Sequence, residues 1–378
     1  MSNKTTETSK AGFKQEIGLF GGVSMLGSIM IGGGIFYLGS YVLQRTDFCM
    51  GLSLLCWVIG GIITMLGGLC FAEMGAMLPK AGGMTVYLNT AFHPLVGFLN
   101  GFNSWLLSGA GSLAAGALAF SAIFGLTGTT GKLVASALMI VFTAYNMLGI
   151  KAGSMFQNFT MVAKLIPIAI IMISAFLMGD VSPDLAILPE GTSFDFSSFI
   201  RMTAFATLAT LWAYEGWINL NTVSEEMKNP KRNLPLSLII AIGGITLLYV
   251  LFNYAIYRVI PADEVRSLID SESFYLGTEV AKRLLGGFGG VIVIIGMTIS
   301  QLGSINGMAI AFPRTYYAMA AEGHFFKSFA KLHPKYRVPT APILCQCLIT
   351  IVLIWLRDLN QLTSLVVFSN MLFNVMVI

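Results

Sequence analysis

The run GSIMIGGGIF, residues 27–36, decides the fold, because three consecutive glycines, Gly32, Gly33 and Gly34, stand in the middle of an apolar stretch. Glycine is about 1 kcal/mol worse than alanine at each position of a helix. Three in a row therefore predict that the helix is interrupted here. Close packing against a neighbouring helix is another common use of glycine in membranes, and the triple glycine alone favours neither role.

A second run of the same kind, AYEGW at 213–217, places the carboxylate of Glu215 and the flexible backbone of Gly216 inside another apolar stretch. It predicts a second interrupted helix. Interrupted helices at matching places in two halves are the best sequence indication of a transporter binding site between inverted repeats. We therefore expect one repeat over 16–178 and another over 198–378, and we favour a binding role for both breaks.

Composition extends this interpretation to the whole chain of 378 residues, of which 56% are hydrophobic and 11% charged, with a mean hydropathy of +0.78. Soluble domains carry about 25% charged residues. The sequence therefore predicts an all-α integral membrane protein with the lipid bilayer as its surroundings, no soluble domain and no nucleic-acid partner. About 20 apolar residues span a bilayer, which gives ten predicted helices, near 16–44, 49–77, 94–125, 131–149, 155–178, 198–220, 235–259, 286–320, 340–357 and 360–378.

The orientation is predicted from lysine and arginine, which concentrate in cytoplasmic loops. Residues 1–15 are polar and lack the apolar core of a signal peptide, so we expect a short cytoplasmic tail. With the N-terminus inside, the outer side receives eight of the 22 basic residues: Arg45, Lys132, Arg201, Arg258, Arg266, Lys282, Arg283 and Arg357. Thirteen, Arg314 among them, fall on the inner side, and Lys164 alone is assigned to a helix. The protein is therefore predicted to cross the cell membrane several times with a cytoplasmic N-terminus.

Two charged side chains deserve a functional interpretation because a charge in the centre of the bilayer costs roughly 2.5–3.5 kcal/mol. Lys164 lies in the fifth predicted helix, where it either serves function or snorkels to the headgroups. Glu215 has too short a stem to snorkel far. It should face a cavity, either to serve the substrate or to accept hydrogen bonds from the amides of the broken helix.

Motifs of enzymes are missing from the sequence. There is no HExxH, no GxSxG and no Walker lysine, and the three histidines, His93, His324 and His333, fall in predicted inner loops. The five cysteines lie in or beside apolar runs without a metal-type spacing, which indicates packing residues. We expect no enzyme activity, cofactor or metal, and energy from a solute or ion gradient.

Five motifs together resemble the L-type branch of the amino acid, polyamine and organocation transporters, and look most like those of bacterial serine/threonine exchangers. The resemblance covers nearly the whole chain, and the fourth motif is the most specific. They are IGGGIF (31–36), FAEMGAMLPKAGG (71–83), AKLIPIAI (163–170), AYEGWINLNTVSEEMKNPKRNLP (213–235) and GSINGMAIAFPRTYYAMAAEGHFFKSFAKLHPKYRVP (303–339).

This resemblance implies a leucine-transporter-type core of five plus five helices in inverted repeats, with helices one and six broken around an amino acid. The N–H groups of Gly33 and Gly34 would hold the substrate carboxylate, because a helix N-terminus is an anion site. Unpaired carbonyls at Met30, Trp212 and Glu215 would hold the ammonium. The resemblance further makes Trp212 the gate that closes from outside, and Lys164 the residue that replaces sodium, bridging helix one to helix eight.

Three departures from the family pattern matter. Gly32, Gly33 and Gly34 stand where relatives have Gly-Ser-Gly, so a hydroxyl near the carboxylate is missing. Glu215 stands where relatives have glycine or aspartate, which favours cationic substrates or internal pairing; we expect neutral substrates. The family has twelve helices, and its last two are expected to be absent because the chain reaches only Ile378.

These features lead to three hypotheses. The first is a sodium-independent antiporter that exchanges small neutral L-amino acids of the serine, threonine and alanine type by alternating access. The second is a proton-coupled uptake carrier with Lys164 or Glu215 as the titrating group, and the third is a membrane scaffold or sensor that binds an amino acid without moving it. The loop near 125–131 lacks the cysteine by which eukaryotic relatives join a heavy chain, so no such disulfide-linked partner is expected.

Overall fold

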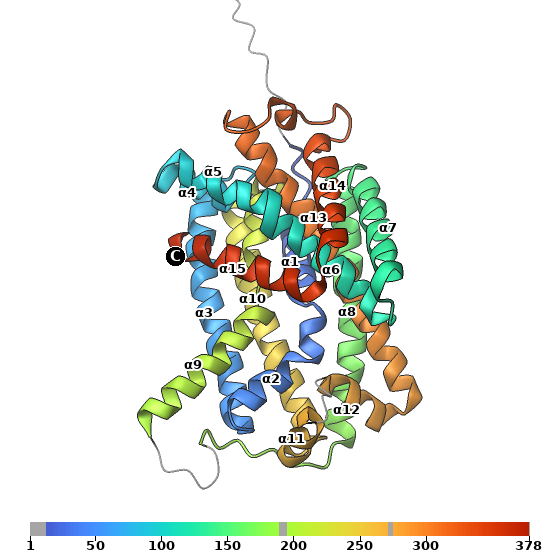
Figure 1. Cartoon of the computed structure of the whole chain (residues 1–378). Coiled ribbons are helices and arrows are strands. Elements are labelled where there is room, and N and C mark those ends of the chain that lie inside the picture. The colour runs from blue at the N-terminus through green and yellow to red at the C-terminus, as the bar shows by residue number, and fades with distance from the viewer. Residues whose placement is uncertain (1–12, 189–194, 271–274, 378) are drawn as a thin grey trace, which may run out of the picture.

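The computed structural model describes residues 13–188, 195–270 and 275–377, which form a bundle of α-helices (Figure 1). Most of the predicted tail at 1–15 lies outside the described residues. The α-helices are α1 Leu19–Met30, α2 Leu38–Arg45, α3 Met50–Met77, α4 Met84–Ala91, α5 Pro94–Asn103, α6 Gly109–Ile123, α7 Gly128–Asn146, α8 Ile150–Met178, α9 Phe196–Ala213, α10 Pro230–Tyr257, α11 Ala262–Asp270, α12 Leu276–Leu285, α13 Gly287–Ala321, α14 Thr340–Leu356 and α15 Leu359–Val377.

Tighter and wider turns complete the helical part of the chain. In the part of the chain that the structure describes, three 3₁₀ segments are η1 Gly33–Phe36, η3 Trp217–Glu226 and η4 Lys327–Ala330, and a π-helical segment, η2 Ser104–Ser108, joins α5 to α6. Within the described residues, six helical segments are long and apolar enough to cross a membrane. They are Met50–Met77, Pro94–Ile123, Gly128–Asn146, Ile150–Met178, Pro230–Tyr257 and Gly287–Ala321. The fold is thus an all-helical membrane protein, whereas the division into inverted repeats stays a prediction.

The structure interrupts the chain at both predicted places. The run predicted as one helix over 16–44 is divided into α1, η1 and α2, because Gly32 adopts an extended backbone with φ −94° and ψ −161°. The second break follows α9, where Gly216 has φ +109°. Only glycine adopts this left-handed region at little cost, so the residue type explains where the chain turns.

Three short helices occupy segments predicted as loops. They are α4 before the third span, and α11 and α12 within the segment 260–285. Each is at most 10 residues long, so none contains the apolar run by which membrane helices were recognised. On the face formed by α11 and α12, Arg283 donates to Glu264 at 2.9 Å, and this hydrogen bond lowers the pKa of the Glu264 carboxyl.

The bundle has two distinct ends (Figure 1). The described chain begins at one end, beside the segment 322–339 that contains η4, and we call this end the N-terminal face; α11 and α12 lie at the opposite face. Between the faces, α1 packs against α8, α10 and α13, and α3 packs against α9 and α10. The broken helix α1 is therefore central, while α15 crosses the front of the bundle at a steep inclination to α3.

Candidate functional site

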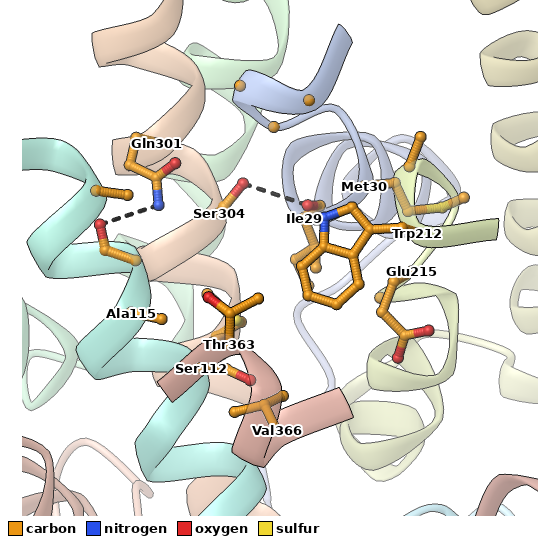
Figure 2. A pocket seen from close by; sticks show the side chains of 18 of the residues that line it. Ile29, Met30, Ser112, Ala115, Trp212, Glu215, Gln301, Ser304, Thr363 and Val366 are labelled. Atoms are coloured by element: carbon orange, nitrogen blue, oxygen red, sulfur yellow. Dashed lines mark hydrogen bonds between the residues drawn. The ribbon is translucent and has the colours of Figure 1, made fainter. Parts of the chain in front are cut away.

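A cavity of about 1330 Å³ lies at the two helix breaks. All six residues predicted to bind substrate line it: Met30, Gly32, Gly33, Gly34, Trp212 and Glu215. Other parts of the wall come from η2 and α6, from α13 and from α15, with further residues from α4, α5, α10, α12 and η3. Figure 2 shows Trp212 and Glu215 on one side of this space and Ser112 and Thr363 on the other. The fold therefore brings together segments that are more than 180 residues apart in the chain.

Gly33 and Gly34 offer backbone donors to this cavity. They are the first two residues of η1, and the first amides of a helical segment have no acceptor in a preceding turn. Such N–H groups favour an anion. A carboxylate is therefore the chemical group that this end of the break fits.

Two of the three carbonyls predicted to be unpaired, those of Met30 and Trp212, accept hydrogen bonds. The Met30 carbonyl accepts from the Gly32 amide at 2.9 Å and lies 3.0 Å from the hydroxyl of Tyr249 in α10. The same hydroxyl lies 2.9 Å from the Ala213 carbonyl, and the Trp212 carbonyl accepts from the Glu215 amide at 3.3 Å. The prediction of a free Met30 carbonyl is wrong for this conformation, because a tyrosine from a third helix reaches both breaks.

Tyr249 was not recognised from the sequence, although it is 1% exposed and lines the cavity. It is one of three tyrosines in α10, with Tyr254 and Tyr257, and no local pattern distinguishes it from the other two. Only the tertiary fold shows that its single proton can be shared between the carbonyls of Met30 and Ala213.

Lys164 is completely buried in α8 and does not snorkel. Its ammonium donates to the carbonyls of Ser28 at 2.9 Å and Ile31 at 2.7 Å, both at the end of α1. Two hydroxyls of α13 donate to the same carbonyls, Ser304 to Ser28 at 2.9 Å and Ser300 to Ile31. The carbonyls of Ser28 and Ile31, at the end of α1, thus accept hydrogen bonds from one ammonium of α8 and two hydroxyls of α13. These bonds link the three helices.

Glu215 projects its carboxylate into the cavity (Figure 2). Among the described residues, no side-chain hydrogen bond or ion pair of this carboxylate is found. The alternative that it ties the amides of the broken helix is therefore wrong for this conformation. Trp212 also lines the cavity, and 39% of its surface is exposed.

Hydroxyl groups on the opposite wall were missed by the sequence interpretation. Ser112 donates to the Ser108 carbonyl at 2.7 Å, and Thr363 donates to the Leu359 carbonyl at 2.8 Å. Both hydroxyls line the cavity and, since their protons are used within their own helices, they offer lone pairs to it. Single serines and threonines in apolar helices carry no signal that distinguishes this role.

Two interrupted helices around a central, partly polar cavity define a membrane transport protein. Comparison with known proteins specifies the class further, since the family model described as amino acid permease matches residues 17–378. The chain therefore belongs to the amino acid permease family of the amino acid, polyamine and organocation superfamily, and it is a transporter rather than an enzyme.

Individual relatives are similar over almost the whole chain. The serine/threonine exchanger SteT of Bacillus subtilis (strain 168) is 30% identical over 375 residues, which cover 98% of this chain and 83% of that protein. The b(0,+)-type amino acid transporter 1 of Mus musculus is 31% identical over 98% of this chain and 76% of its own length. The large neutral amino acids transporter small subunit 2 of Mus musculus is 30% identical over 95% and 68%.

Proposed function

We propose that this protein is a sodium-independent antiporter that exchanges small neutral L-amino acids across the cell membrane by alternating access. One observation carries the proposal: the buried ammonium of Lys164 is bonded to the carbonyls that the first break releases. A transporter that uses sodium needs oxygen ligands for the ion, and here a fixed cation already occupies such oxygens. The similarity to the SteT exchanger supports the exchange mode.

The substrate would lie with its two charged ends at the breaks. Its carboxylate would accept from the amides of Gly33 and Gly34. Its ammonium would face the carbonyl of Glu215 and the second lone pair of the Trp212 carbonyl, whose first lone pair accepts from the Glu215 amide. Trp212 would close over the substrate from the face that carries α11 and α12, which we propose to be the outer face. These contacts involve the main chain, so they fit the part that all amino acids share.

Exchange is tested by uptake of radiolabelled serine into proteoliposomes that are either preloaded with unlabelled serine or left empty. We expect uptake only with internal amino acid, and no change when sodium is replaced by choline or when a pH gradient is imposed. Uptake into empty vesicles driven by external acid would replace exchange with proton coupling. Binding of serine without any uptake would favour a sensor instead.

Cationic amino acids are a second candidate substrate class, and the unpaired carboxylate of Glu215 favours it. A carboxylate facing a cavity attracts a positively charged side chain, with a bonus of about 1.5–3 kcal/mol for a charge-assisted hydrogen bond. If lysine is a substrate, Glu215→Gln should weaken the inhibition of radiolabelled serine uptake by lysine at least about tenfold, which corresponds to about 1.4 kcal/mol. Inhibition of the same uptake by alanine should change little. Equal effects on both amino acids would exclude this role.

The protein is also proposed to act without a disulfide-linked heavy chain. The connection between α6 and α7, residues 124–127, has no cysteine. Exchange by the purified chain alone in vesicles tests this proposal directly, because a required partner would leave the chain inactive.

A further inference from the structure

A second, much smaller cavity lies where α14 packs against α6, α7 and α13 (Figure 1). It shares no lining residue with the larger cavity. Its volume is about 10 Å³, which is about the room that one water molecule needs. All eight residues that line it are at most 8% exposed, so it lies inside the protein. Three of them are polar, Thr143 and Asn146 of α7 and Gln346 of α14, and the other five are apolar.

The side-chain amide of Gln346 supplies hydrogen-bond donors to this cavity. The residue is 2% exposed, and its Nε2 has no hydrogen-bond partner among the described residues. Native proteins seldom bury a polar group in this way, and ordered water is a common partner where no protein atom is within reach. Gln346 therefore needs a ligand that accepts a hydrogen bond.

Asn146 supplies an acceptor to the same cavity. Its Nδ2 uses both N–H groups, one to the Phe142 carbonyl at 2.9 Å and one to Asn306 Oδ1 at 3.0 Å. Its Oδ1 accepts no hydrogen bond from the part of the chain that the structure describes. Thr143 lies about one turn before Asn146, on the same side of α7, and its hydroxyl can donate and accept. The cavity thus has donors on the α14 side and acceptors on the α7 side.

Asn146 is also the first member of a chain of buried amides that leads to the first helix break. Asn306 of α13 accepts from Asn146 and donates to Gln157 Oε1 of α8 at 2.8 Å. The carbonyl of Gln157 accepts from the hydroxyl of Ser28 in α1 at 3.1 Å. The carbonyl of Ser28 is one of the two that Lys164 binds. We call Asn146, Asn306 and Gln157 the amide chain.

We propose that the small cavity is the binding site of one water molecule, which accepts from Gln346 Nε2 and donates to Asn146 Oδ1 and to the Thr143 hydroxyl. Water fits better than an ion, because no charged side chain lines the cavity and its walls present donors as well as acceptors. The water connects α14 to the amide chain and hence to the helices around the first break. This inference does not rest on the proposed function, since no residue of the site lines the larger cavity.

The water site is tested directly by an experimental structure of the purified protein, at a resolution that shows ordered water elsewhere in its interior. We expect a peak of density at about 2.7–3.2 Å from both Gln346 Nε2 and Asn146 Oδ1, the ordinary range of hydrogen-bond distances. If other buried waters are visible and this peak is missing, the proposal is overturned.

Two substitutions that nearly preserve side-chain size test which groups bind the water. Gln346→Met and Thr143→Val each remove a polar partner, and a buried water needs two to four such partners. We expect each variant to lose or weaken the density peak and to have a lower Tm in detergent. In the double variant the fall in Tm should be smaller than the sum of the two single falls, because both groups bind the same molecule. Additive falls would contradict a shared ligand.

A matched control separates the water from a general effect of removing a glutamine. Gln44→Met, at an exposed position of α2, should change neither the density peak nor the Tm. Thr143→Val leaves Gln346 and the amide chain intact, so it stays informative if Gln346→Met does not fold. A peak that persists unchanged in both cavity variants, whatever their Tm, would refute Gln346 and Thr143 as ligands of the water.

Discussion

Tyr249 and Lys164 solve the same problem at the residue level. A broken helix leaves carbonyl groups without their helical partners, and a buried unpaired carbonyl costs about 1–3 kcal/mol. Tyr249 reaches the Met30 and Ala213 carbonyls from α10, and Lys164 reaches the Ser28 and Ile31 carbonyls from α8. The breaks are therefore stable because side chains from unbroken helices supply the missing donors.

Removal of the Tyr249 hydroxyl should destabilise both breaks. Tyr249→Phe keeps the ring in its cluster with Trp57 and Tyr214 but leaves a buried carbonyl unpaired, so we expect a loss of about 1–3 kcal/mol, seen as a lower Tm in detergent. Tyr254→Phe, one turn along the same helix and only half-buried, is the control. Equal Tm values for the two variants would contradict the role of the hydroxyl.

Removal of the Lys164 ammonium should create a site for a small cation. The carbonyls of Ser28 and Ile31 and the hydroxyls of Ser300 and Ser304 are oxygen ligands of the kind that hard cations prefer. In Lys164→Ala we expect lost exchange and a Tm that rises when sodium replaces choline. Lys151→Ala, an exposed position on the same helix, should show neither effect. A sodium response of the unaltered protein would refute the proposed sodium independence.

The free-energy cost of placing an ionised group inside a membrane segment explains which site residues could be predicted from the sequence. Lys164 and Glu215 were recognised because an ionised group inside a membrane segment is too expensive to be incidental. Tyr249, Ser112 and Thr363 have no comparable cost, and their roles depend on which helix faces which. The free carbonyl predicted for Met30 failed for the same reason, since its partner comes from a distant part of the chain.

At the scale of elements, Gly216 fixes the second break through its backbone. Its φ of +109° is strained for other residues, and a Cβ at this position would lie 2.5 Å from the Ile29 side chain. Gly216→Ala should therefore cost about 1–3 kcal/mol through strain and abolish exchange. In the double variant Gly216→Ala with Ile29→Ala, only the clash is relieved and the backbone strain remains, so we expect the Tm to recover in part. Complete recovery would show that sterics alone demand glycine here.

The elements differ in how far the sequence predicted them. Both breaks were predicted because glycine and an acid interrupt apolar runs, and the interruption is local. The short helices α4, α11 and α12 and the π-helical segment η2 were not, because they lack a long apolar run and depend on contacts with other helices. In η2, for example, Tyr316 of α13 donates to the Ser104 carbonyl at 3.0 Å, a contact that no local pattern announces.

At the scale of the whole molecule, the charge pattern predicts which face meets the cytoplasm. Lys335 is exposed on the N-terminal face and Asp263 is exposed on the opposite face. In a background without native cysteines, Lys335→Cys should react with an impermeant maleimide in inside-out vesicles only, and Asp263→Cys in right-side-out vesicles only. The reverse pattern would invert the proposed orientation.

The shared hydroxyl of Tyr249 also bears on how such a protein can change over time. Because one oxygen serves both breaks, a mutation that shifts either backbone segment alters the hydrogen bond available to the other. New substrate preferences selected at one break should therefore arise together with compensating substitutions at the other or in α10, rather than independently. A library randomised at both breaks would show this as pairs of enriched substitutions.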